Sequence, residues 1–121
     1  MARISDLVGN TPLVELTRLN PNKNVTVYAK MEGHNPGGSV KDRAALNMIR
    51  SALDRGDIKS GTTLIEATSG NTGIALAMIA GTYNIPISLI MPSNSTKERT
   101  QTMEAFGAKV ILLDTIEDCR D

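Results

Sequence analysis

The fold is decided by residues 63–113, which read TLIEATSGNTGIALAMIAGTYNIPISLIMPSNSTKERTQTMEAFGAKVILL. Short β-branched and aliphatic runs alternate there with two longer stretches of helical character, and polar or glycine-containing turns separate them. The predicted order is strand, helix, strand, helix, strand, over residues 63–67, 74–83, 87–91, 96–106 and 109–113. This alternation is typical of a parallel sheet with right-handed crossovers. We expect an α/β fold with a three-layer αβα, Rossmann-like sheet that has helices on both of its faces.

The first half of the chain predicts fewer regular elements. A short apolar run occupies residues 13–16, and residues 25–32 alternate in the manner of a strand. A helix is expected to begin at Ser39, because Ser39 and Asp42 have the spacing of a capping box, and to end at Gly56. Its buried face is expected to contain Ala44, Ala45, Met48, Ile49, Ala52 and Leu53.

Composition argues against several classes of function. The 121 residues carry 13 Lys and Arg against 13 Asp and Glu, and only 2% are aromatic, so neither a nucleic acid nor a membrane is an expected partner. The single cysteine, Cys119, cannot form an internal disulfide, and we expect a reducing, cytoplasmic location. With one histidine, His34, and no cluster of ligating side chains in the sequence, we predict no metal site.

A polar loop at residues 68–73 is the first candidate site. Ligands of parallel sheets bind where the carboxyl ends of strands lead into helices, and this loop, TSGNTG, follows a predicted strand and opens a predicted helix. Its hydroxyl and amide donors, together with the free N–H groups of a helix start, fit a phosphate or a carboxylate. The same residue types also cap helices, so anion binding and simple capping are equally open from the loop alone.

The second candidate is Lys41, which follows the turn-rich segment 33–39 in the first turn of a predicted helix. The positive end of the helix dipole favours the neutral amine there, and partial burial would act in the same direction. A neutral amine is what Schiff-base chemistry requires. Most lysines are simply solvated, so the position of Lys41 beside Gly37 and Gly38 favours a catalytic role without establishing it.

Three stretches together resemble one known family. They are GNTPL at residues 9–13, KMEGHNPGGSVKDR at residues 30–43 and EATSGNTG at residues 66–73. Their wording and order are similar to those of the cysteine synthases (O-acetylserine sulfhydrylases), which are pyridoxal-phosphate enzymes of fold type II. The wording is closer to the B-type of these enzymes than to the A-type, and cystathionine β-synthases share the motifs.

The resemblance implies a role for each matching residue. Lys41 matches the lysine that forms the internal aldimine with pyridoxal 5′-phosphate, and Asn71 matches the asparagine that hydrogen-bonds the 3′-oxygen of this cofactor. Thr68, Ser69, Asn71 and Thr72 match the loop that binds the substrate carboxylate. The implied reaction is a β-replacement, in which O-acetyl-L-serine loses acetate to give an aminoacrylate and a sulfur donor adds to the β-carbon to give L-cysteine.

The resemblance also implies that the chain is the N-terminal portion of a longer enzyme. Residues from about 35 to 121 correspond to most of the smaller mobile domain, and residues 13–34 correspond to strands of the larger domain. In the family, the loop for the cofactor phosphate and the serine for the pyridine nitrogen lie beyond residue 121, so we expect the chain alone to bind the cofactor weakly and to be poorly active. The full-length form is expected to be a homodimer. The alternatives are a cystathionine β-synthase-like or other fold type II lyase, a non-catalytic amino-acid-binding module, and an inactive fragment.

Overall fold

The computed structural model describes residues 1–68 and 70–114. The second half of the chain forms the elements that the sequence predicts, with ends that differ by at most three residues. The elements are η1 (Ile4–Leu7), β1 (Leu13–Glu15), β2 (Tyr28–Lys30), η2 (Glu32–His34), α1 (Lys41–Arg55), β3 (Leu64–Ala67), α2 (Asn71–Thr82), β4 (Ile87–Pro92), α3 (Lys97–Ala105) and β5 (Lys109–Leu113).

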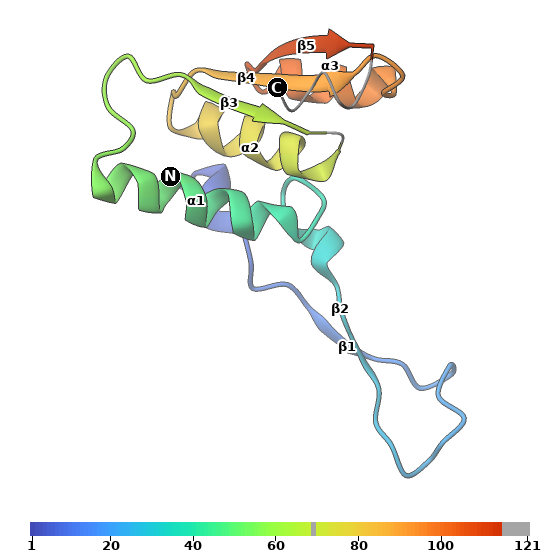
Figure 1. The fold of residues 1–121 in the computed structure, drawn as a ribbon. Helices are drawn as coiled ribbons and strands as arrows, with labels where there is room; N and C mark the ends of the chain where they lie inside the picture. The colour runs from blue at the N-terminus through green and yellow to red at the C-terminus, as the bar shows by residue number, and fades with distance from the viewer. Residues whose placement is uncertain (69, 115–121) are drawn as a thin grey trace.

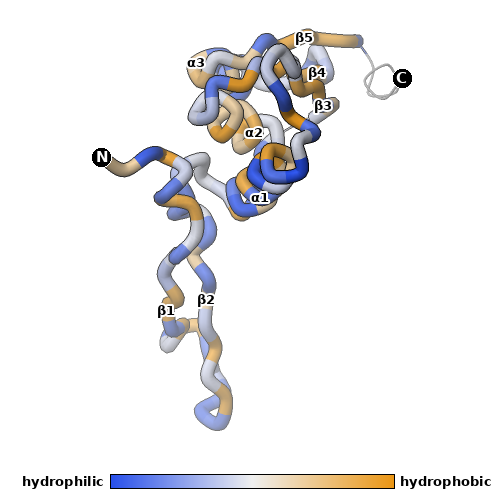
Figure 2. Tube along the Cα trace, turned by 90° about the vertical axis from the view of Figure 1, so that its left-hand side faces the viewer, coloured by the Kyte–Doolittle hydropathy of each residue, from blue (hydrophilic) through white to orange (hydrophobic). Residues whose placement is uncertain are grey.

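Three parallel strands form the central sheet in the order β3-β4-β5. The register pairs Leu64 with Ile87 and Ile90 with Ile111. Helices α2 and α3 contact each other, and α2 also contacts α1 on its other side. Figures 1 and 2 show the resulting layers, which are the sheet, then α2 with α3, then α1. The predicted α/β class with a parallel sheet is therefore confirmed.

The prediction of helices on both faces of the sheet is wrong for the described residues. The strands follow one another across the sheet in sequence order, so successive crossovers of one hand place α2 and α3 on the same face. On the opposite face Ile65 is 67% exposed and Ala67 is also exposed. The third layer is α1, which packs on the outside of α2 and does not cover the second face.

The core lies between the sheet and the helices. Helix α2 is apolar on nearly every side, and residues 75–80 are all buried, as the sequence predicts. Met78 and Ile79 from this helix meet Leu89 and Met91 from β4 in one cluster, which Met103 of α3 completes. Helix α2 is thus held from both sides, and this fixes the position of its N-terminal end.

Helix α1 begins at Lys41, two residues later than predicted, and the predicted capping box does not form. The Ser39 hydroxyl accepts the N–H of Lys41 at 3.1 Å, whereas the Asp42 carboxyl reaches back to Gly37 instead of Ser39. The helix ends at Gly56 in the left-handed region, with φ 78°, as predicted. Of the expected buried face, Ala45 and Ile49 are buried, Ala52 and Leu53 are half-buried, and Ala44 and Met48 are exposed.

Strands β1 and β2 pair antiparallel and form a hairpin that extends away from the helices and the sheet (Figures 1 and 2). Both strands are shorter than the runs at residues 13–16 and 25–32 that predicted them. Leu13, Val14 and Tyr28 are exposed on this hairpin. The division of the chain into two domains near residue 35 stays a prediction. No helix in the described part of the chain is long and apolar enough to span a membrane.

Candidate active site

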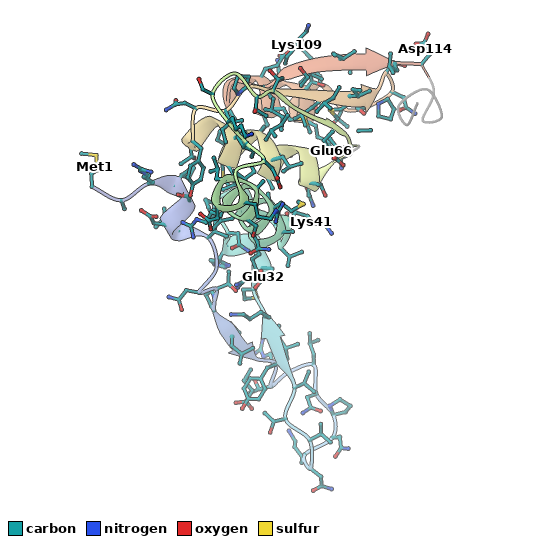
Figure 3. The ribbon with its side chains drawn as sticks, turned by 60° about the vertical axis from the view of Figure 1, so that its left-hand side comes forward. Met1, Glu32, Lys41, Glu66, Lys109 and Asp114 are labelled. Carbon is teal, nitrogen blue, oxygen red and sulfur yellow. The ribbon has the colours of Figure 1, made fainter. Side chains whose placement is uncertain are left out.

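The two predicted loops lie at the same end of the molecule. Figure 1 shows the first turns of α1 and α2 on the side where β3 ends, which is the carboxyl edge of the sheet. The packing of α1 against α2 holds these two helix starts together. In Figure 3, Lys41 lies between Glu32 at the base of the hairpin and Glu66 in β3. This packing therefore places both candidate loops at the edge of the sheet where parallel sheets bind ligands.

Lys41 is exposed at the first position of α1. Its backbone N–H donates to the Ser39 hydroxyl, and its Nζ has no hydrogen-bond or ion-pair partner among residues 1–68 and 70–114. Partial burial of this side chain does not occur in the chain as described. What the structure provides is an accessible, unpaired primary amine, the group that a pyridoxal aldehyde requires.

The turn before Lys41 is fixed by two side chains. The amide of Asn35, which is 3% exposed, donates to the backbone carbonyl of Glu32 at 2.9 Å, and its Oδ1 accepts the Gly9 N–H at 2.7 Å. The Gly38 N–H donates to the carbonyl of Asn35 at 2.8 Å, and Gly38 has φ 88°, a conformation that favours glycine. Asp42, which is fully buried, accepts the Gly37 N–H at 2.5 Å.

Glu32 is the centre of a polar network at the base of the hairpin. Arg43 donates to both of its carboxylate oxygens, at 2.8 Å from Nε and 3.0 Å from Nη2. The Thr11 hydroxyl donates to Glu32 at 2.6 Å, and the Asn35 amide donates at 2.9 Å. The bonds from Arg43 and then Thr11 lower the pKa of Glu32 to about 2. This network joins residues before β1, after β2 and in α1.

Sequence reasoning missed the Glu32 network, although its residues lie within the motifs that carry the family resemblance. Thr11 is 21 residues from Glu32, and Arg43 is 11 residues away, so no helical or strand periodicity connects them. The signal that could have found the network is that Glu32 and Arg43 lie in the same motif, on either side of the turn at residues 33–39.

The loop at residues 68–73 combines capping with free donors. The Thr68 hydroxyl accepts the Gly73 N–H at 3.1 Å and the Gly70 N–H at 3.4 Å, so it caps α2. The N–H groups of Asn71 and Thr72 make no hydrogen bond to another described residue. The Thr68 hydroxyl, with its oxygen accepting from the helix, keeps its own hydrogen to donate outward. Capping and anion binding are therefore compatible in this loop.

The positions of the predicted site residues differ in accessibility. Asn71 is exposed and Thr68 and Thr72 are half-buried, whereas Ser69 lies outside the described residues. Gly73 is buried, and a Cβ atom there would collide with the side chain of Thr68. This glycine therefore allows the loop to close on its own helix start rather than on a ligand.

The remaining candidates carry no chemistry that the structure supports. His34 is exposed, and no group of ligating side chains in residues 1–68 and 70–114 could hold a metal ion. Cys119 lies outside the described residues. A hollow of about 520 Å³ lies between α1 and β3, but neither Lys41 nor the 68–73 loop lines it. The chemically suited groups are on the surface at the carboxyl edge, and we place the candidate site there.

Comparison with known proteins shows which family the chain resembles. The chain matches the family described as pyridoxal-phosphate dependent enzyme over residues 4–121. It is 57% identical to cysteine synthase B of Pseudomonas aeruginosa, covering 98% of this chain and 40% of that protein. It is 47% identical to the O-acetylserine dependent cystathionine β-synthase of Bacillus subtilis, covering 89% of this chain and 35% of that protein.

A solved structure has a similar fold. The crystal structure of O-acetylserine sulfhydrylase isoform 3 from Entamoeba histolytica matches with a TM-score of 0.93 and 40% identity, covering 98% of this chain and 38% of that one. The chain thus spans 35–40% of the length of these three relatives.

Proposed function

Because the chain belongs to the pyridoxal-phosphate dependent enzyme family, we propose that it supplies the lysine and the carboxylate-binding loop of a cysteine synthase. The reaction is the replacement of the acetate of O-acetyl-L-serine by a sulfur nucleophile, which gives L-cysteine. The observation that carries the proposal is the unpaired amine of Lys41 at the same edge of the fold as the free donors of residues 68–73. The chain corresponds to about 40% of such an enzyme, so the complete reaction requires more than these residues.

The residues present fit pyridoxal 5′-phosphate in their donor chemistry. Lys41 would hold the cofactor covalently through Nζ, and the exposed amide of Asn71 would donate to its 3′-oxygen. When bound, the cofactor supplies a conjugated ring that withdraws electrons from the substrate Cα. Lys41 Nζ would be the base that accepts the Cα proton.

The substrate carboxylate would bind at the start of α2. The Thr68 hydroxyl has a hydrogen to donate, and the N–H groups of Asn71 and Thr72 are free of bonds to described residues. The partial positive charge of the helix start adds to these donors. Ser69, which lies outside the described residues, is expected to contribute its hydroxyl to the same carboxylate.

The sulfur nucleophile separates the two enzyme candidates. The similarity to an O-acetylserine dependent cystathionine β-synthase favours, as a second candidate, an enzyme that uses homocysteine instead of an inorganic sulfur donor. Both candidates share every step up to the loss of acetate. We further propose a homodimeric full-length form and a cytoplasmic location, in keeping with the single cysteine of the sequence.

The test is to mix the purified full-length form with pyridoxal phosphate and record the visible absorption of the bound cofactor. A band that forms with the parent and is absent in Lys41→Ala supports the proposal. Calorimetry with O-acetylserine, with and without the cofactor, is the second measurement. Binding that depends on neither the cofactor nor Lys41 would favour a non-catalytic amino-acid-binding module, and the absence of a cooperative melt would favour an inactive fragment.

A further inference from the structure

We propose that Asp42 is a positioning residue for Lys41, acting through its buried hydrogen bond to the Gly37 amide; this rests on the proposed function. Asp42 directly follows Lys41 in the first turn of α1. Its carboxyl is fully buried and reaches back over the helix start to the turn that precedes Lys41. The bond therefore closes residues 37–42 into a hydrogen-bonded loop that includes Lys41.

The contact between Asp42 and Gly37 is close and fits only glycine. The Gly37 N–H donates to Asp42 Oδ2 at 2.5 Å. A Cβ atom at Gly37 would lie within 3.0 Å of the carboxyl carbon of Asp42 and would collide with its oxygens. Because a real Cβ does not approach backbone or side-chain atoms this closely, the turn can meet the carboxyl only with a glycine at this position.

Stability alone does not account for this carboxyl. Its second oxygen, Oδ1, is buried and has no hydrogen-bond partner among the described residues. Burial raises the pKa of Asp42, which means that the environment disfavours the charged form. A buried polar atom without a partner costs free energy, so a group of this kind needs a reason other than stability.

Positioning is the reason that the geometry supplies. Successive residues on an α-helix point about 100° apart, so the inward direction of Asp42 fixes the outward direction of Lys41. On the other side, Arg43 is bound to Glu32. The two residues after Lys41 are thus anchored to the turn and to the hairpin base, and Lys41 is directed to the carboxyl edge of the sheet.

The test compares Asp42→Ala with Asp42→Asn, since asparagine keeps an oxygen that can accept the Gly37 N–H. Asp54→Ala, at an exposed position of the same helix, is the matched control. Each variant is made in the full-length form and treated with pyridoxal phosphate and borohydride, and labelling of Lys41 is measured against labelling of exposed Lys59 by peptide mass. The preference for Lys41 should fall about tenfold in Asp42→Ala, stay within about threefold in Asp42→Asn and be unchanged in Asp54→Ala.

A second variant approaches the same contact from the other side. Gly37→Ala keeps the aspartate in the sequence, but the added Cβ would displace its carboxyl from the turn. This variant should therefore lower the labelling preference for Lys41 as Asp42→Ala does. Amide hydrogen exchange at Gly37 is followed in parallel, and it should be slow in the parent and fast in Asp42→Ala.

The outcomes separate the two proposals. A Lys41 preference that persists in Asp42→Ala, or that falls equally in Asp42→Asn, overturns the positioning role. A full-length parent that labels Lys41 no faster than Lys59 contradicts the proposed function. Amide exchange at Gly37 that is unchanged in Asp42→Ala overturns the contact between Asp42 and Gly37.

Discussion

Replacing Gly73 by alanine tests how closely the loop at residues 68–73 closes on the start of α2. Gly73 is the third residue of α2, where alanine instead of glycine would ordinarily stabilise a helix by up to about 1 kcal/mol. Here the added Cβ would collide with the Thr68 methyl group and would lie 2.8 Å from the Met103 Cε and 3.3 Å from the Thr68 hydroxyl oxygen. The Met103 methyl is the end of a flexible side chain, so Thr68 is the side chain that must yield.

Two opposing effects decide the sign of this substitution. Overpacking of a closed site costs about 1–3 kcal/mol, which exceeds the helix-propensity gain. Moving Thr68 also weakens its bond to the Gly73 N–H, which is 3.1 Å long. We therefore expect Gly73→Ala to lower the free energy of unfolding by on the order of 1 kcal/mol.

The double variant makes the argument specific. Thr68→Ser removes the methyl group that collides with the new Cβ and keeps the capping oxygen. Alone it should cost up to about 0.8 kcal/mol, the value of one buried methylene. In the Gly73→Ala background it should instead stabilise, and the coupling between the two sites should be about 1 kcal/mol or more. Urea unfolding followed by far-UV circular dichroism measures this, because the chain has no tryptophan for fluorescence. Additive effects of the two substitutions, or a Gly73→Ala chain as stable as the parent, would refute the reasoning.

Two further predictions concern the network and the core. The folded-state pKa of Glu32, about 2, lies below its ordinary value of 4.5, so its contribution to stability is present above pH 4.5 and is lost as the pH falls through 2. The difference in unfolding free energy between the parent and Glu32→Gln should therefore shrink over this range, as measured by urea unfolding at a series of acidic pH values. Leu89→Ala removes a fully buried side chain of β4 and should cost about 2–5 kcal/mol in urea unfolding, against less than about 1 kcal/mol for the half-exposed Leu112 in β5.

Local sequence patterns were sufficient to predict the helices and strands of residues 63–113. Strands and helices there are set by short apolar runs and by turns, and the buried helix α2 is apolar over residues 74–80 whichever face is considered. The side of the sheet on which the helices lie is a different kind of property. It depends on the spatial order of β3, β4 and β5, which the run of residues along the chain does not specify.

The start of α1 shows why the site was harder to predict than the fold. Ser39 and Asp42 have capping-box spacing, but Asp42 instead bonds Gly37, five residues earlier in the chain. The sequence predicts Lys41, Thr68, Ser69, Asn71 and Thr72 as site residues through the family resemblance, and those roles stay predictions. It could not identify Glu32, because its partners Arg43 and Thr11 come from separate elements that only the fold brings together.

The consecutive residues Lys41, Asp42 and Arg43 have three different surroundings, and the helix explains why. A turn of about 100° per residue sends Asp42 into the interior and Arg43 toward Glu32, and it leaves Lys41 on the open side. Among these three charged groups, only the lysine amine is without a partner in the described part of the chain. A helix start anchored at two of its side chains holds the backbone of the third residue in place, so Lys41 would lose little backbone freedom on binding a ligand. Under the proposed function, this is how the chain would present the amine at one place.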